Sequence, residues 1–308
     1  MASKIKNILH LLRVRQYYKN VMIFVGIFFS RMMFEASLYL DLIIGFILLC
    51  CASSFNYIIN DLKDIEYDKS HPEKIRKKPL ASGEISIFFA ILLLVLLTTI
   101  SIFLLIFILP NLGLIIMIIL IIVTGQLYNH IFKNYAFVDI LVLSTGYLWR
   151  ALAGCVIIEQ YVSAWLFLAI FEIALFLSIA KRKGDLMLLG ENKAIDHKKV
   201  YDQYSLTLLD RFHILIAGAL FMTYALYLII NFELDTPVAL YEYIVIFTIP
   251  ISLYIIMRYM YLTSSKPEIA RSAERAFFDK GIIIAAIVLF IILFFSFYFD
   301  KIVEILTF

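Results

Sequence analysis

Residues 282–299 read IIIAAIVLFIILFFSFYF, a run of eighteen residues without a charge. About 20 predominantly apolar residues in a helix cross the roughly 30 Å hydrocarbon core of a bilayer. Similar runs recur along the 308-residue chain, which is 63% hydrophobic and 17% charged, whereas soluble domains are about 25% charged. This composition excludes a soluble globule, a disordered chain and a nucleic-acid-binding module, and it indicates a polytopic membrane protein.

Nine apolar stretches are predicted to span the membrane as helices. A bilayer core leaves every backbone polar group to be satisfied internally, and no barrel-like alternation is present. The expected spans are residues 21–34, 38–60, 85–109, 112–127, 136–157, 163–181, 212–232, 241–262 and 277–299. The first is short and is expected to be partly interfacial. We therefore predict an all-α, nine-helix bundle forming a single integral membrane domain, residues 1–308, with polar loops at 61–84, 128–135, 181–211 and 263–276.

The distribution of positive charge predicts the orientation of this bundle. In the nine-span arrangement, 24 of the 27 lysines and arginines lie on one side, and only Arg31 and Lys301 lie on the other. Loops rich in Lys and Arg stay in the cytoplasm. We expect an inner-membrane protein with a cytoplasmic N-terminus, a polar cytoplasmic cap that holds the active site, and a C-terminus on the outer side.

The most informative polar segment ends the second expected span. Asp61, Asp64 and Asp68 are spaced i, i+3, i+7, which places them within about 60° of one another on a helix. Asn60 and Asn56 extend this row deeper into the membrane. Three carboxylates on one stripe repel one another unless a cation binds, and hard oxygen ligands of this kind suit Mg²⁺. The alternative is a solvated helix end, but three aspartates and two asparagines on one face favour a metal site.

A basic loop follows at once. Four of the five residues 74–78 are cations, namely Lys74, Arg76, Lys77 and Lys78. A carboxylate–metal cluster beside such a loop is suited to a diphosphate, because the ion bridges its oxygens while the cations neutralise the remaining charge. The alternative is that the cations only set topology or contact anionic headgroups.

Other ionisable groups occur near the same predicted face. Asp139 lies just inside the fifth expected span, and it is either part of a cytoplasmic cavity or the partner of Lys133 in a salt bridge. Arg150 and Glu172 have matching depths in neighbouring spans, which predicts a structural ion pair. Cys50, Cys51 and Cys155 all fall in spans and have no metal-ligand spacing, so they are interpreted as buried apolar side chains.

The segment Asn60-Asp61-x-x-Asp64-x-x-x-Asp68 resembles the first aspartate-rich motif of the UbiA superfamily of membrane prenyltransferases. Within that superfamily the chain is most similar to the decaprenyl-phosphate (polyprenyl-phosphate) phosphoribosyltransferase branch. Four further stretches carry this resemblance, in order along the chain: residues 13–20; His71-Pro72 to Pro79-Leu80-Ala81-Ser82-Gly83; Tyr128, Lys133, Asp139, Arg150 and Ala153-Gly154; and Lys181-Arg182 with Asp185.

The resemblance implies a UbiA-like fold and a Mg²⁺-dependent transfer of phosphoribosyl from phosphoribosyl pyrophosphate to a polyprenyl phosphate. It implies that Asp61, Asp64 and Asp68 bind the metal and that Asn60 orients a carboxylate or a ribose hydroxyl. Residues expected to bind substrate or phosphate are Lys19, Asn20, Lys74, Arg76, Lys78, Tyr128, Lys133, Asp139, Lys181 and Arg182.

One departure from the prenyltransferases of the superfamily bears on the substrate. They carry a second aspartate-rich motif after the sixth span, whereas this chain has Lys181-Arg182-Lys183-Gly184-Asp185 there. Extra cations match the extra phosphates of a phosphoribosyl donor and a lipid phosphate acceptor. The alternatives are a UbiA-type prenyltransferase acting on an aromatic or lipid acceptor, and a transporter or channel, which usually shows internal repeats and ionisable groups at the midplane.

Overall fold

The computed structural model describes residues 2–70, 75, 78–161, 163–190, 199–234 and 236–307, and within these ranges it contains helices and no strand. Eight helical stretches are long and apolar enough to cross a membrane. They are α3 (Leu38–Lys63), α6 (Ile87–Phe103) with η2 (Leu104–Ile108), α7 (Leu112–His130), α8 (Val138–Ile157), α9 (Ala164–Leu189), α11 (Leu206–Asn231), α12 (Leu240–Tyr243) with η5 (Ile244–Phe247) and α13 (Thr248–Ser265), and α15 (Lys280–Thr307). The expected multi-pass, all-α fold is confirmed.

Local sequence explains where several of these helices begin. The side chains of Ser86, Asn111 and Ser205 each accept a hydrogen bond from the backbone N–H three residues later, at the starts of α6, α7 and α11. Ser and Asn are preferred at this position because they satisfy an otherwise unpaired N–H group of the first turn. The short polar links between the apolar runs therefore also supply the helix caps.

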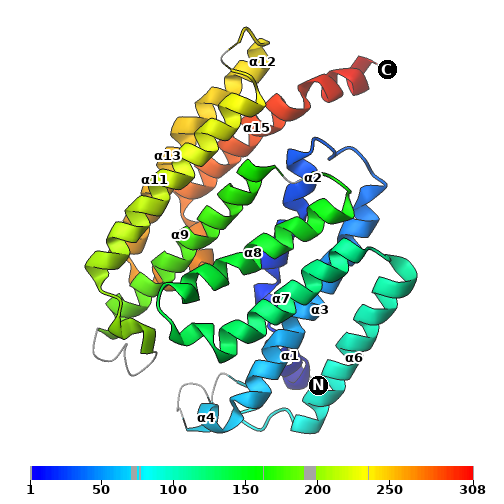
Figure 1. The fold of residues 1–308 in the computed structure, drawn as a ribbon, viewed down its shortest axis with the longest axis vertical. Helices are drawn as coiled ribbons and strands as arrows, with labels where there is room; N and C mark the ends of the chain where they lie inside the picture. The colour runs from blue at the N-terminus through cyan, green and yellow to red at the C-terminus, as the bar shows by residue number, and fades with distance from the viewer. Residues whose placement is uncertain are drawn as a thin grey trace. The chain divides into compact units, whose positions relative to one another are not determined.

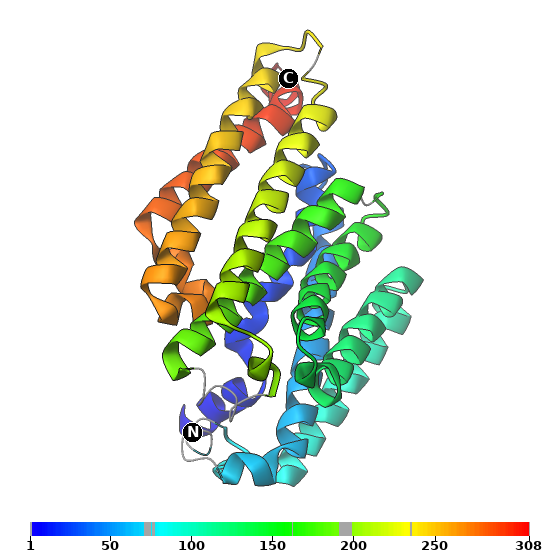
Figure 2. The same cartoon turned by 60° about the vertical axis from the view of Figure 1, so that its left-hand side comes forward.

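The chain divides into two compact units, which are described separately. The first comprises Met1–Phe132 and Thr145–Val162, and the second comprises Lys133–Ser144 and Ser163–Phe308. In the first unit α6 and α7 both pack on α3 (Figure 1), and the core includes Ile23, Leu48, Leu114 and Ala153, all buried. In the second unit α9 packs on α11 and α13 packs on α15 (Figures 1 and 2).

The expected first span, 21–34, is not a long α-helix. The structure has a short α1 (Ala2–Leu11), a 3-10 helix η1 (Val14–Phe24) and a five-residue α2 (Val25–Phe29). The apolar run Val21–Phe29 would rise only about 14 Å as an α-helix, which is too short to cross a bilayer alone. Nine regular spanning helices are therefore not found in the described residues.

The η1–α2 segment nevertheless runs antiparallel to α3 over the length of that helix. Arg13 contacts Asp61 in the last turn of α3, and the Tyr17 hydroxyl hydrogen-bonds Ser54. At the other end of α3, the Tyr39 hydroxyl donates to the Met33 carbonyl. The 26 residues of α3 extend about 39 Å. The N-terminal segment thus covers the same distance without being a regular helix.

The described residues of the loops expected at 181–211 and 263–276 are largely helical. α9 continues past the expected boundary to Leu189, α14 (Pro267–Arg271) packs against it, and η6 covers Ala273–Phe278. Lys183, Gly184 and Asp185 are buried, and a Cβ on Gly184 would lie 2.7 Å from the Cβ of Ala270. Hydropathy misses this extension because the helix continues through polar residues that α14 covers.

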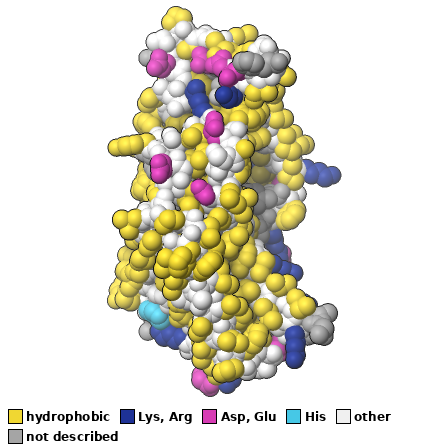
Figure 3. All heavy atoms as spheres, turned by 90° about the vertical axis from the view of Figure 1, so that its right-hand side faces the viewer, with side chains coloured by type: hydrophobic (Ala, Val, Ile, Leu, Met, Phe, Trp, Pro, Cys, Tyr) yellow, Lys and Arg dark blue, Asp and Glu magenta, His cyan; other side chains and the backbone are white. Residues whose placement is uncertain are grey.

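The outer surface of the first unit is apolar. The side chains of Phe88 and Val95 on α6 are 78% and 58% exposed, and that of Phe107 on η2 is 70% exposed. Figure 3 shows the face that lies on the right-hand side of Figure 1. Hydrophobic side chains predominate on it, between scattered charged groups. Since a soluble protein rarely exposes such large apolar patches, this surface is suited to contact with lipid.

Gly154 permits the closest backbone approach in the first unit. A Cβ at this position would lie 1.8 Å from the carbonyl oxygen of Ile23 in η1. We expect Gly154→Ala to lower the free energy of unfolding by about 1–3 kcal/mol, the usual cost of overpacking. Thermal unfolding in detergent measures this change.

Gly218→Ala is the matched control, since nothing lies within 4 Å of its Cβ position, and it should stabilise α11 by up to about 1 kcal/mol. Equal effects of the two substitutions would contradict this packing.

Candidate functional site

The three aspartates do not share one continuous helix. Asp61 lies in the last turn of α3, Asp64 ends that helix with φ −90° and ψ 8°, and Asp68 lies in the short α4 (Ile65–Lys69). The expected single stripe is therefore wrong in its helical geometry. The break at Asp64 still brings Asp61 and Asp68 to a common partner, so the cluster is assembled by a bend and not by helical periodicity alone.

That common partner is Lys78, in the segment after α4. Its Nζ lies 3.0 Å from Asp61 Oδ1 and 2.5 Å from Asp68 Oδ2. The side chains of both aspartates are almost fully buried, with 4% and 2% exposed, while that of Lys78 is 21% exposed. One ammonium group therefore bridges two buried carboxylates, and such charge-assisted hydrogen bonds are strong.

A second cation, Arg13, completes the neutralisation. Its Nη2 lies 2.9 Å from Asp61 Oδ1, and its guanidinium sits over the ring of Tyr57, 4.3 Å from the centroid. The Tyr57 hydroxyl donates to Gln16 Oε1 at 2.6 Å. The resemblance of residues 13–20 to the family includes Arg13 but implies no role for it. Its position before the first apolar run is the sequence feature that could have indicated a place near the polar end of α3.

The other residues of the predicted row have different surroundings. Asp64 and Asn60 are half-buried, and among the described residues neither side chain has an ion pair or hydrogen bond. Asn56 is buried, donates to the Ile121 carbonyl at 3.0 Å and accepts from Gln126 at 2.7 Å. Asn56 thus links α3 to α7 by hydrogen bonds.

The Asp61–Asp68 pair fits a small divalent cation. The structure already places one positive group between two carboxylate oxygens, and Mg²⁺ is usually held by one or two carboxylates together with water and phosphate oxygens. No group of three His, Cys, Asp or Glu residues arranged to hold a metal occurs in the described ranges. Two carboxylates would therefore hold Mg²⁺ only together with water or phosphate oxygens.

A separate polar cluster occupies the second unit. Arg182 Nε lies 2.7 Å from Asp139 Oδ2, with 1% and 0% of the two side chains exposed. The Tyr204 hydroxyl donates to Asp139 Oδ1 at 2.6 Å and accepts from the Phe137 N–H at 2.7 Å. Asp139 therefore pairs with Arg182, and the alternative salt bridge to Lys133 is not formed.

The same cluster continues along the polar end of α9. The Tyr201 hydroxyl donates to Asp185 Oδ2 at 2.6 Å, and Arg271 Nε lies 3.0 Å from Asp185 Oδ1. Lys183 pairs with Asp210 at 2.5 Å and donates to Ser264. Burial raises the pKa of the Tyr201 phenol and also that of Tyr204, so both remain protonated donors. These charges are paired internally.

The remaining predicted phosphate ligands lie on several elements of the two units. Lys19 Nζ lies 5.9 Å from the ring centroids of Tyr18 and Tyr147, and Asn20 is buried at 1% exposure. Tyr128 lies near the end of α7, Lys133 in η3 (Phe132–Asn134), and Lys181 is exposed on α9. Lys74 and Arg76 lie outside the described residues.

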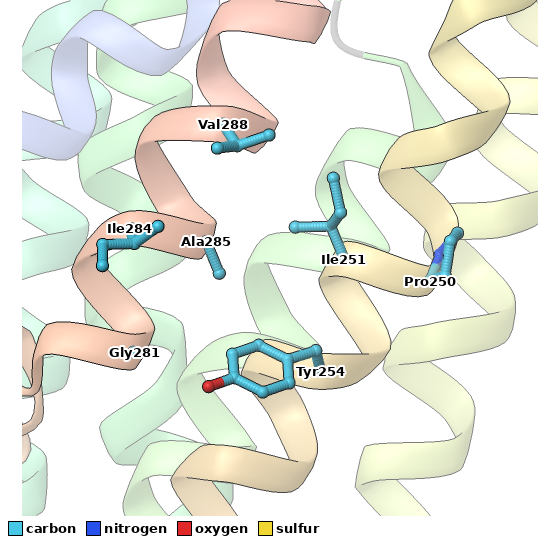
Figure 4. Close-up of a pocket in the computed structure, with 7 residues that line it drawn as sticks. All are labelled: Pro250, Ile251, Tyr254, Gly281, Ile284, Ala285 and Val288. Carbon is cyan, nitrogen blue, oxygen red and sulfur yellow. The ribbon is translucent and has the colours of Figure 1, made fainter.

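A cavity of about 440 Å³ lies in the second unit between α13 and α15, lined by Pro250, Ile251, Tyr254, Ile284 and Val288 among others (Figure 4). The Tyr254 hydroxyl is the polar side-chain group on its wall. Without a carboxylate or a cation among its lining residues, this cavity cannot hold a metal–diphosphate group and is no part of the candidate site.

The fold and the bridged aspartates define a class of membrane transferase. A family model described as "UbiA prenyltransferase family" matches residues 21–280. The chain belongs to the UbiA prenyltransferase family, and it is a multi-pass membrane protein.

The chain is also similar in sequence to two enzymes that share one name. Decaprenyl-phosphate phosphoribosyltransferase from Corynebacterium glutamicum is 30% identical over 218 residues, which cover 70% of this chain and 65% of that enzyme. The enzyme of the same name from Mycolicibacterium smegmatis is 30% identical over 184 residues, 60% of this chain and 57% of that protein. The matched region thus covers less than two thirds of each of these two enzymes.

Solved structures agree on the fold. A UbiA homologue from Archaeoglobus fulgidus bound to DMAPP and Mg²⁺ has a TM-score of 0.65 and 19% identity, covering 94% of this chain and 98% of that one. The apo UbiA homologue from Aeropyrum pernix has a TM-score of 0.54 and 14% identity, covering 92% and 97%. The UbiA-like fold is therefore confirmed.

Lys78 should contribute to stability through the two carboxylates it bridges. We expect Lys78→Met to lower the free energy of unfolding by about 2–3 kcal/mol, less than for a fully buried pair because Lys78 is partly exposed. Added MgCl₂ should restore more stability to the variant than to the wild type. Thermal unfolding with and without Mg²⁺ checks both statements.

Lys69→Met is the control for this measurement. Lys69 pairs with Glu66 at the surface, where 49% and 88% of the two side chains are exposed, and such pairs contribute about 1 kcal/mol or less. A loss at Lys69 equal to that at Lys78 would show that the bridge does not stabilise the fold.

Proposed function

We propose that this protein transfers a 5-phosphoribosyl group from phosphoribosyl pyrophosphate to a polyprenyl phosphate and releases diphosphate, in a Mg²⁺-dependent reaction. The observation that carries the proposal is the buried Asp61–Asp68 pair bridged by Lys78. Such a site accepts a cation and the phosphates bound to it. The relatives named decaprenyl-phosphate phosphoribosyltransferase support the choice of donor and acceptor.

The reaction needs little from the protein beyond positioning and charge. An oxygen of the lipid phosphate forms a bond to C1 of the ribose, the C1–O bond to diphosphate breaks, and its electron pair leaves with the diphosphate. The lipid phosphate is already an anion, so no strong general base is required. Catalysis then depends on groups that stabilise charge on the leaving diphosphate.

The chain supplies these groups at the end of α3. Asp61, Asp64 and Asp68 would hold Mg²⁺, which when bound stabilises the charge of the leaving diphosphate. Lys78 would turn from the carboxylates to the phosphate oxygens, and Asn60 would orient a carboxylate or a ribose hydroxyl. Lys19, Asn20, Lys74, Arg76, Tyr128, Lys133 and Lys181 are proposed to share the remaining phosphate and substrate contacts.

The second unit is proposed to contribute mainly through its fixed geometry. Arg182 is hydrogen-bonded to Asp139, and Lys183 is paired with Asp210. These two cations therefore have anionic partners within the protein. We propose that Asp139 and Arg182 act by positioning the polar end of α9, which carries Lys181.

We also propose the orientation suggested by the charges, with the N-terminus and the site in the cytoplasm and the C-terminus outside the inner membrane. The η1–α2 segment, which follows α3 over its whole length, would be the ninth crossing. The lysines and arginines of residues 1–20 and 61–84 then lie on one side, as the positive-inside rule requires.

A second candidate is transfer of a prenyl group from a prenyl diphosphate to an aromatic or lipid acceptor. The Archaeoglobus fulgidus homologues bound to DMAPP and to GPP with Mg²⁺ favour it through their common fold. The basic sequence Lys181-Arg182-Lys183 in place of a second acidic motif favours the phosphoribosyl donor. Membership of a transferase family argues against a transporter or channel.

Membranes containing the protein test the reaction directly. With ribose-labelled phosphoribosyl pyrophosphate, polyprenyl phosphate and Mg²⁺, we expect label in a lipid-extractable product. EDTA should abolish the transfer and excess Mg²⁺ should restore it. Asp61→Asn and Asp64→Asn should each reduce the rate by about 100-fold or more, because they remove charge from the metal site.

Asp41→Asn is the matched control, because Asp41 lies in the first turn of α3, at its opposite end, and this variant should keep wild-type activity. Label transfer from a prenyl diphosphate, with none from phosphoribosyl pyrophosphate, would replace the proposed reaction by the second candidate. Full activity in both Asp61→Asn and Asp64→Asn would remove the metal role.

A further inference from the structure

Arg150 lies in the membrane-spanning part of α8, and its partners in the described residues of the first unit are neutral. Its Nε donates to Asn20 Oδ1 at 2.7 Å, its Nη2 donates to Ser53 Oγ at 3.2 Å, and its Nη1 donates to the Gly146 carbonyl. No carboxylate in the described part of the chain forms an ion pair with it. Arg150 therefore donates to three neutral acceptors of the first unit, and the ion pair predicted with Glu172, which lies in the second unit, stays a prediction.

Such an arrangement is costly unless a ligand supplies negative charge. Ionisable residues within spanning segments are rare, usually pair with one another and mark functional sites. Removing a charge from water without an opposite charge carries a large desolvation penalty. The three acceptors of Arg150 are neutral and supply no negative charge to offset that penalty, so they alone do not account for an arginine.

The surroundings of Arg150 form a built site. Asn20 is 1% exposed, and its Nδ2 also donates to Cys50 Sγ at 3.2 Å, which fixes the oxygen that Arg150 uses. Gly146 leaves room for the guanidinium, since a Cβ there would lie 3.2 Å from Nη1. A guanidinium carries five N–H donors, and three are used, so two remain for a ligand.

A second cation lies near the same turn of α8. The ammonium of Lys19, the residue before Asn20, is 5.9 Å from the ring of Tyr147, which lies one turn from Arg150. Two positive groups on neighbouring elements match a phosphate monoester, which carries up to two negative charges. Arginine also binds phosphate oxygens in a bidentate manner.

The depth of Arg150 separates it from the aspartates. Its partner Ser53 precedes Asp61 by eight residues on α3, which corresponds to about 12 Å along the helix axis. A diphosphate bound at Asp61 would not occupy both places. A phosphate at Arg150 would therefore be a second group, separate from that diphosphate.

We propose that Arg150, assisted by Lys19, binds the phosphate monoester of a substrate about 12 Å along α3 from the aspartate site. This inference rests on the proposed function, in which two substrates carry such a group: the acceptor lipid and the 5-position of the donor sugar. Both present the same chemistry to a guanidinium. A binding experiment distinguishes them.

The test compares Arg150→Gln, Arg150→Lys and wild type in purified full-length protein. The probes are a polyprenyl phosphate and, separately, phosphoribosyl pyrophosphate with Mg²⁺, with affinity measured by calorimetry and stability by thermal unfolding. We expect Arg150→Gln to unfold at the wild-type temperature or above it without ligand, because an uncompensated charge has been removed. Its affinity for one of the two probes should fall by about tenfold or more, the usual contribution of a charge-assisted hydrogen bond, and Arg150→Lys should retain part of that affinity.

The probe whose binding weakens identifies the source of the phosphate. Glu172→Gln is the control for neutralising a charge within a span, and it should bind both probes as the wild type does. Wild-type affinity of Arg150→Gln for both probes would overturn the proposal. So would a destabilised or unfolded Arg150→Gln, or one whose stability Glu172→Gln restores, because the charge would then be structural.

These outcomes are independent of the transfer assay. If Asp61→Asn abolishes transfer and Arg150→Gln binds both probes normally, the proposed function stands and this inference fails. If no phosphoribosyl transfer occurs but Arg150→Gln loses affinity for polyprenyl phosphate, the phosphate site stands and the proposed donor is wrong.

Discussion

The structure of the first unit depends on the neutralisation of two buried carboxylates at the end of α3. Asp61 and Asp68 share the Lys78 ammonium, and Asp61 also binds Arg13. Leaving one partner of such a pair alone in a buried environment is strongly destabilising. The same contacts fix the start of the N-terminal segment and the chain after α4. The groups proposed to meet the diphosphate thus also hold three parts of the chain together.

The two units treat their buried charges in different ways. In the second unit, Asp139 and Arg182 neutralise each other, and Asp185 has Arg271 and Tyr201 as partners. In the first unit, Arg150 meets only neutral oxygens. Charges that pair within the protein stabilise or position the backbone around them. A cation without a carboxylate partner is instead suited to an anionic ligand. This contrast is why Arg150, and not Arg182, is proposed to bind a phosphate.

Sequence reasoning predicted the class of fold well and the local geometry less well. Long uncharged runs such as 282–299 predicted spanning helices because burial in lipid demands them. It misplaced the end of α9, where Lys183 and Asp185 are buried by α14, and it expected a helix over 21–34, where only α2 is α-helical. It grouped Asp61 with Asp68 correctly, but through a periodicity that the bend at Asp64 breaks. The partners Arg13 for Asp61 and Arg182 for Asp139 depend on tertiary packing, which no local pattern specifies.

The central claim is that the aspartates ending α3 hold a divalent cation that carries a diphosphate. Electron–nuclear double resonance on protein loaded with Mn²⁺ and pyrophosphate measures this directly, because ³¹P couples to Mn²⁺ only when phosphate oxygens are its ligands. The account predicts a bound Mn²⁺ signal with ³¹P coupling in the wild type and its loss in Asp61→Asn. A bound Mn²⁺ signal without ³¹P coupling, or an unchanged coupling in Asp61→Asn, would contradict it.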